Sequence, residues 1–295
     1  MAANGIDVQK ISGALGAEIY GVDLGGPLTN TEFDAVHQAF LDHQVIFFRD
    51  QKIAPDQHMA FGRRFGELDI HPFAAGLDDH PEVMPVVKEA EDHASYNFGG
   101  TWHSDVTFYE KPALGSILYA LDVPPYGGDT MFANQYMAYE SLSDGMKEML
   151  GGLTAIHNAS HAYGRGGRND RRDATATPRS MKVRTGDDAE AEVEHPVVRT
   201  HPETGKTGLY IHGGFLRHES LYDTRTNNPL GADASREIVQ ELLDQHSKAE
   251  YICRFKWTPG SIAFWDNRAV QHYAASDYYP HERLLRRVTI SGDKP

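Results

Sequence analysis

The stretch TWHSDVTF, residues 101–108, places a histidine and an aspartate one residue apart among β-branched and aromatic residues. This composition predicts a strand, and in a strand His103 and Asp105 share one face. An imidazole and a carboxylate on one face can bind a metal ion, or they can form an ordinary buried hydrogen bond. The 16 histidines and 42 acidic residues predict about two such His-x-acid pairs by chance, and three occur, so the pair alone leaves both interpretations open.

The last quarter of the chain supplies a second histidine, His272, followed by two arginines in RLLRRVTIS. Strand alternation over this run puts Arg283 and Arg287 on one face with Leu285. Two arginines on one buried face repel each other unless anions lie between them. We therefore expect these arginines to bind anionic ligands.

Two histidines and one carboxylate form the facial triad of non-heme Fe(II) oxygenases, which leaves three coordination positions open. Two of these positions can take the keto and carboxylate oxygens of a 2-oxo acid, and the third can take dioxygen. A nearby arginine can bind the far carboxylate of that acid through two hydrogen bonds. The two stretches together contain two histidines, an aspartate and two arginines, which are the residue types that an Fe(II) and 2-oxo acid site requires.

The same stretches carry a family resemblance. The whole chain resembles the taurine dioxygenase/TfdA family of Fe(II)- and 2-oxoglutarate-dependent dioxygenases, from GALGAEIYGVDL near the start to RRVTISGDKP at the end. WHSDVTF is similar to the segment with the family's first two metal ligands, and WDNRAVQHYA is similar to the segment with the third. The resemblance implies that Fe(II) is bound by His103, Asp105 and His272. It also implies that Arg283 and Thr130, the latter in YGGDT, bind the distal carboxylate of 2-oxoglutarate.

The resemblance assigns further residues to the primary substrate. His71 and Arg287 are similar to residues that bind an anionic head group in the family. The other substrate-binding positions that it implies are Phe215, Val106, Phe108 and Asn97. From the residues alone, Arg287 could instead pair with a buried carboxylate, His71 could only cap a loop, and the phenylalanines could belong to the core.

Two departures from the taurine-oxidising members concern the substrate. Ala74 stands where they have a tyrosine, and Gly99 stands where they have an asparagine, with Asn97 two residues earlier as its substitute. Part of the polar contact set is therefore missing, while the anion-binding residues are retained. The expected substrate is a small anion: a sulfonate such as taurine, an alkyl sulfate ester or an aryloxyalkanoate. Its hydroxylation would often cleave a C–S or C–O bond, giving succinate and CO2.

The elements that must position these residues are mainly strands. Short strand-like runs bounded by glycine or proline include VIFFRD, GSILYALDV, TMFANQ, GLYIHGGF, YICRFKW, GSIAFWD and RVTISG. Helices are expected in TNTEFDAVHQAFLDHQ, where Thr29 and Glu32 have capping-box spacing, in APDQHMAFGRRFG and in ASREIVQELLDQHSK. This pattern predicts a mainly β fold with helical cover, and the resemblance implies a double-stranded β-helix, a jelly-roll variant.

We expect residues 1–295 to form a single dioxygenase domain. The segment from Gly164 to Glu194 is rich in charged, glycine and small polar residues, which is typical of a long loop. Because the oxidation chemistry needs water excluded from the site, we expect this segment to be a mobile lid that closes over bound substrate.

The net charge of −14 argues against nucleic acid or an anionic membrane surface as a partner, since both favour a basic face. No apolar run approaches the roughly 18 residues of a membrane span. The single cysteine, Cys253, excludes an intramolecular disulfide, and its alternation with aromatic residues predicts a buried thiol in a cytoplasmic protein. The resemblance implies a homodimer or homotetramer.

Two other functions stay open at this point. A non-oxidative metal enzyme on a cupin-like jelly roll could use the same three ligands with zinc or manganese, but it would not need Arg283 and Thr130 to bind a diacid. A catalytically silent ligand-binding jelly roll would leave a buried set of two histidines and an aspartate unexplained.

Overall fold

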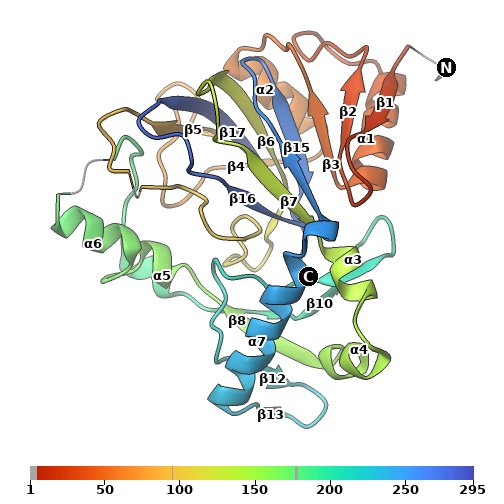
Figure 1. Ribbon diagram of the computed structural model, residues 1–295, viewed down its shortest axis with the longest axis vertical. Coiled ribbons are helices and arrows are strands. Elements are labelled where there is room, and N and C mark those ends of the chain that lie inside the picture. The colour runs from red at the N-terminus through yellow and green to blue at the C-terminus, as the bar shows by residue number, and fades with distance from the viewer. Residues whose placement is uncertain (1–4, 95, 177–178) are drawn as a thin grey trace.

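The computed structural model describes residues 5–94, 96–176 and 179–295 (Figure 1). Among these residues, eight strands form a large sheet: β1 (Asp7–Lys10), β2 (Ala17–Tyr20), β3 (Val45–Phe48), β4 (Leu68–Asp69), β5 (Val83–Lys88), β6 (Ala113–Asp122), β15 (Ile262–Asp266) and β17 (Arg283–Ser291). Their spatial order is β1-β2-β3-β15-β6-β17-β4, and β5 also pairs with β17. The paired strands run antiparallel except β2 and β3, which are parallel.

Two helices, α1 (Asn30–His43) and α2 (Pro55–Arg63), cover one face of the large sheet. The predicted capping box begins α1, because Thr29 Oγ1 accepts a hydrogen bond from Glu32 N at 3.2 Å and Glu32 Oε2 accepts one from Thr29 N at 2.8 Å. Phe40 of α1 stacks on Phe264 of β15 with ring centroids 4.1 Å apart. Aromatic packing of this kind attaches the helix layer to the sheet.

The opposite face of the large sheet packs on a three-stranded sheet in the order β14-β7-β16, with β14 (Ile252–Phe255), β7 (Thr130–Asn134) and β16 (Val270–Ala274). Phe47 of β3 stacks on Phe255 of β14 at 4.0 Å. Cys253 is buried between the sheets, as predicted, and burial raises the pKa of its thiol to about 12. Because both of their faces are covered, β3 and β15 read as continuous apolar runs. The two facing sheets form the predicted jelly roll.

The remaining elements lie beside the two sheets, mostly at the lower end of Figure 1. A four-stranded sheet has the order β13-β12-β8-β9, and β10 pairs with β11. These strands are β8 (Leu153–His157), β9 (Val193–Pro196), β10 (Val198–Thr200), β11 (Thr207–Leu209), β12 (Tyr222–Asp223) and β13 (Asn228–Pro229). The helices are α3 (Gln135–Glu140), α4 (Asp144–Leu150), α5 (Ser160–Tyr163), α6 (Arg168–Ala174) and α7 (Ala232–His246), with 3-10 turns η1 (Asp187–Glu190) and η2 (Ala249–Tyr251).

Three local expectations differ from the structure. Residues 101–108 form a turn after an isolated bridge at His103, so the predicted strand is wrong there. The strand expected in GLYIHGGF ends at Leu209 and the chain continues without regular structure. The segment 164–194 contains α6 and η1 and begins β9, so it is partly helical, and its mobility stays a prediction.

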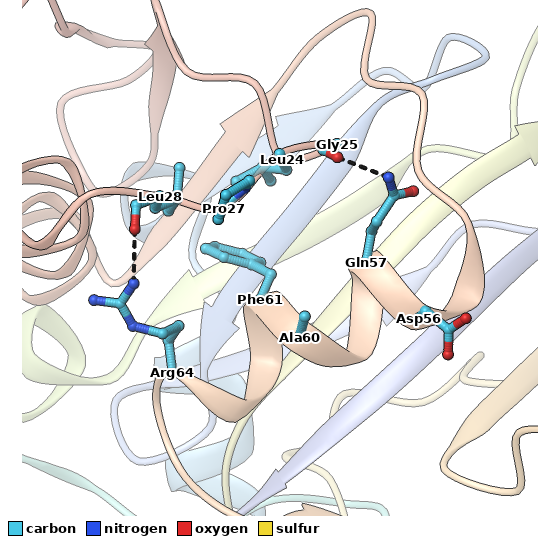
Figure 2. Close-up of a pocket in the computed structure, with 10 residues that line it drawn as sticks. Leu24, Gly25, Pro27, Leu28, Asp56, Gln57, Ala60, Phe61 and Arg64 are labelled. Carbon is cyan, nitrogen blue, oxygen red and sulfur yellow. Dashed lines mark hydrogen bonds between the residues drawn. The ribbon is translucent and has the colours of Figure 1, made fainter.

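A cavity of about 400 Å³ lies between the loop 24–28 and α2 (Figure 2). Two of its polar side chains bond to that loop, since Gln57 Nε2 donates to Gly25 O at 2.7 Å and Arg64 Nη1 donates to Leu28 O at 3.0 Å. The carboxylate of Asp56 lies 3.1 Å from His80 Nε2. None of the site residues predicted from the sequence lines it. The charged groups of this cavity are therefore already partnered within the protein. Among the described residues, no helix is long and apolar enough to cross a membrane.

Candidate active site

Direct backbone pairing holds the two candidate ligand histidines together. His103 N donates to His272 O at 3.1 Å, and His272 N donates to His103 O at 2.8 Å. The two ring centroids are 4.1 Å apart. Because His272 lies in β16, this isolated bridge attaches the 101–108 segment to the smaller sheet and brings both imidazoles to one place.

Asp105 reaches the same place through a turn. The chain reverses just after it, and Val106 has a φ of 45°, in the left-handed region. Asp105 N donates to Asn267 Oδ1 at 3.1 Å, and Ser116 Oγ donates to Asp105 Oδ2 at 2.7 Å. The other oxygen, Oδ1, lies 3.7 Å from His103 Nε2 and 3.9 Å from His272 Nε2.

The three side chains fit a divalent metal ion. Their candidate ligand atoms lie within 4.8 Å of one another, and all three residues are buried. His103 Nδ1 is 2.6 Å from Thr101 O, and since a carbonyl only accepts, Nδ1 carries the hydrogen and Nε2 keeps its lone pair for a metal. Burial lowers the pKa of both histidines, which keeps them neutral. Burial alone would raise the pKa of Asp105, but the charge of Arg287, with the hydrogen bond from Ser116, lowers it well below its usual range.

Arg283, at the start of β17, is a buried cation without a carboxylate partner among the described residues. Its Nε and Nη2 are both buried and have no hydrogen-bond partner within residues 5–94, 96–176 and 179–295. These two nitrogens form the side-on edge of a guanidinium, which matches the two oxygens of a carboxylate. The guanidinium lies 5.8 Å from the ring centroid of Trp257, whose Nε1 donates to Thr130 Oγ1 at 3.0 Å. An anion bound here would satisfy the two free donors.

Arg287 lies on the same face of β17 and is also buried, as strand alternation predicted. Its Nη1 donates to Asp105 Oδ1 at 2.8 Å, so it does pair with a buried carboxylate. Among the described residues its Nε has no hydrogen-bond partner, and the one hydrogen bond of its Nη2 is a weak one to the sulfur of Met84, at 3.9 Å. Part of the guanidinium is thus still available to a second anion.

His71 caps a loop and also presents a donor. Its Nδ1 accepts hydrogen bonds from Phe73 N at 3.1 Å and Ala74 N at 3.0 Å, so the ring hydrogen must lie on Nε2. Burial, and to a smaller extent the positive charge of Arg287, lower the pKa of His71 to about 3. The side chain is therefore a neutral hydrogen-bond donor beside a guanidinium.

A cavity of about 130 Å³ opens over the candidate metal site. Of the predicted substrate-binding residues, four line this cavity: His71, Val106, Phe215 and Arg287. Phe108 lies behind Phe215, with ring centroids 5.0 Å apart, and joins an apolar cluster. Asn97 Nδ2 donates to Ala274 O at 2.8 Å, and Asn97 lines the small space beside Arg283 instead.

Several residues that the fold brings to the site had no role assigned from the sequence. Ser116 and Asn267 hydrogen-bond to Asp105. The sequence feature that could have identified them is a small polar residue within an apolar strand, or directly after one. Tyr163 and Arg168 line the cavity from α5 and α6, which lie to one side of the sheets in Figure 1. Arg168 belongs to a run of charged residues, so its sequence context did not distinguish it.

The chain is similar to a known protein family and to several characterised proteins. The family model described as taurine catabolism dioxygenase TauD, TfdA family matches residues 7–289. An alpha-ketoglutarate-dependent sulfate ester dioxygenase of Pseudomonas putida is 35% identical over 98% of this chain and 91% of its own. An alpha-ketoglutarate-dependent 2,4-dichlorophenoxyacetate dioxygenase of Cupriavidus pinatubonensis is 31% identical, over 94% of each chain. A crystal structure of a taurine dioxygenase from Burkholderia xenovorans has a TM-score of 0.78 and 34% identity, covering 98% of this chain and 90% of that one.

Proposed function

Since the chain belongs to the taurine catabolism dioxygenase TauD, TfdA family, we propose that it oxidises a small organic anion held by Arg287 and His71. The chain is a 2-oxoglutarate-dependent dioxygenase, and its family implies Fe(II), 2-oxoglutarate and dioxygen. The relatives named above act on a sulfate ester, an aryloxyacetate and taurine, so family membership alone does not select the head group.

In this proposal His103, Asp105 and His272 hold the Fe(II). When bound together with 2-oxoglutarate and dioxygen, the iron supplies the oxidant for the substrate C–H bond. Ser116 and Asn267 orient Asp105, while Thr101 O orients His103. These contacts fix the direction of the ligand atoms before the metal arrives.

The single observation that carries the dioxygenase assignment of this site is the unpartnered edge of Arg283, which we assign to 2-oxoglutarate. A buried guanidinium with two free donors is costly unless an anion binds there. The distal carboxylate of 2-oxoglutarate would satisfy both donors, with Thr130 close to the same place through Trp257. A non-oxidative metal enzyme would give this arginine no ligand, and a silent binding protein would leave the buried set of His103, Asp105 and His272 unexplained.

The primary substrate needs a separate anion site, because Arg287 lies four residues beyond Arg283 along β17, about 13 Å in an extended strand. The free part of the Arg287 guanidinium and the Nε2 hydrogen of His71 can bind an anionic head group. An anchored head group fixes which carbon lies at the metal, so positional selectivity follows.

In the overall reaction the two oxygen atoms of O2 enter two different products. One oxygen atom of O2 enters the new carboxylate of succinate as the first carboxylate of 2-oxoglutarate leaves as CO2, and the other enters the substrate C–H bond. Hydroxylation next to a heteroatom gives an adduct that splits into a carbonyl compound and the released anion or phenol. The hydroxyl proton leaves with the heteroatom group.

Succinate release with Fe(II), 2-oxoglutarate and oxygen tests the proposal. The panel should include taurine, hexyl sulfate, hexanesulfonate and phenoxyacetate, with hexanol as the neutral control. We expect at least one anion to stimulate succinate release well above the uncoupled rate, while hexanol does not. A neutral compound that works as well as its anionic counterpart would show that Arg287 and His71 do not anchor the substrate.

We also propose a cytoplasmic location and a homodimeric or homotetrameric assembly with no nucleic-acid or membrane partner. The acidic net charge of −14 supports the absence of a polyanionic partner. Cell fractionation and light scattering of the purified protein test these two points.

A further inference from the structure

A second guanidinium faces the substrate cavity from a different part of the fold. Arg168 is the first residue of α6, and it lines the same cavity as His71 and Arg287. The side chain is half-buried, and its Nε is shielded from solvent and has no hydrogen-bond partner in the part of the chain that the structure describes. Arg287 comes from the large sheet, so the two guanidiniums reach the cavity from two separate elements.

Three other arginines of the 164–194 segment have carboxylate partners, whereas Arg168 has none among the described residues. Arg165 pairs with Asp187, Arg179 with Asp173 and Arg184 with Asp188. Within the described residues, no carboxylate lies in ion-pair contact with Arg168. A positive group directed into a cavity without a counterion is poised to bind an anion from solution.

The charge of Arg168 acts on residues next to the metal site. Burial raises the pKa of Tyr163 to about 12, while the charges of Arg287 and Arg168 both oppose that rise. His103 also lies within the electrostatic reach of both arginines. The cavity thus has two cations, and only Arg287 is partly compensated, by Asp105.

We propose that Arg168 is a second residue for the substrate head group, and that it selects a sulfate or sulfonate over a carboxylate. This inference rests on the proposed function. A carboxylate has two oxygens in one plane, and a single guanidinium edge occupies both. A sulfate or sulfonate has three terminal oxygens in a tetrahedral arrangement, which leaves acceptors for Arg168 after Arg287 and His71 have bound.

The test compares Arg168→Gln with Arg165→Gln. Arg165 lies three residues earlier, its side chain is 80% exposed and it does not line the cavity, so it is a matched control. Each variant is loaded with Fe(II) and 2-oxoglutarate without oxygen, and hexyl sulfate and heptanoate are titrated in by calorimetry. We expect Arg168→Gln to weaken hexyl sulfate binding by about 10- to 150-fold, the value of one charged hydrogen bond. Heptanoate binding and the affinity for 2-oxoglutarate should change much less, and Arg165→Gln should behave like the wild type.

The outcomes separate the two proposals. The inference is overturned if Arg168→Gln binds hexyl sulfate as tightly as the wild type does. It is also overturned if the variant loses affinity for hexyl sulfate and for heptanoate by the same factor. In both cases the proposed function stands. If no anion binds or stimulates succinate release in the wild type, the proposed function fails first. Arg168→Lys keeps the charge, so its affinity for hexyl sulfate should lie between those of Arg168→Gln and the wild type. If Arg168→Gln does not fold, Arg168→Lys is compared with the wild type instead.

Discussion

Replacing Arg283 with lysine tests the co-substrate site most directly. Arginine offers the Nε and Nη2 hydrogens to the two oxygens of a carboxylate, and both nitrogens are unpartnered in the structure. Lysine keeps the charge but acts as a point donor, so one charged hydrogen bond of about 1.5–3 kcal/mol is lost. The dissociation constant of 2-oxoglutarate should rise about 10- to 150-fold.

The same substitution should not destabilise the ligand-free protein. The two donors that it removes are buried and unsatisfied there, so their loss leaves no new orphaned acceptor. Calorimetric titration with 2-oxoglutarate in the absence of oxygen and urea unfolding of the ligand-free variant measure the two effects. If Arg283→Lys instead weakened the primary substrate and left 2-oxoglutarate binding unchanged, the roles of Arg283 and Arg287 would be reversed.

Three further predictions concern the metal, the core and the lid. Asp105→Asn should abolish turnover and lower the bound iron, measured by metal analysis; it is preferable to alanine, which would strand Arg287 without its partner. Full activity in this variant would exclude Asp105 as a ligand. Burial lowers the pKa of His58 to about 4. Between pH 6.5 and 4 the imidazole is therefore protonated in the unfolded chain but neutral in the folded one. As the pH drops through this window, the free energy of unfolding should fall by roughly 3 kcal/mol. Urea unfolding at several pH values in this range should show a smaller fall in the free energy of unfolding for His58→Gln than for the wild type. An equal fall in both proteins would show that His58 does not cause the pH dependence. Trypsin should cut the 164–194 segment first, and iron, 2-oxoglutarate and substrate together should protect it; unchanged cleavage would count against a lid.

The sequence by itself determined which residues share a face wherever the local structure is regular. Alternation in β17 placed Arg283 and Arg287 on one buried face, and Thr29 and Glu32 marked the start of α1. These predictions succeed because strand and helix periodicity depend on residues close in sequence. The ligand types and the family motifs also lie within short stretches, so the metal and co-substrate hypotheses needed no tertiary information.

The tertiary structure decided how those residues meet. His103 and Asp105 come together through a turn at Val106, held by Ser116 and Asn267, and not through the strand that alternation suggested. The pairing of His103 with His272 depends on how the 101–108 segment docks against β16, which no local pattern encodes. Arg168 reached the cavity only because α6 folds over it. Side-chain facing is a property of one segment, whereas distances across a site depend on the register and packing of segments that are remote in the chain.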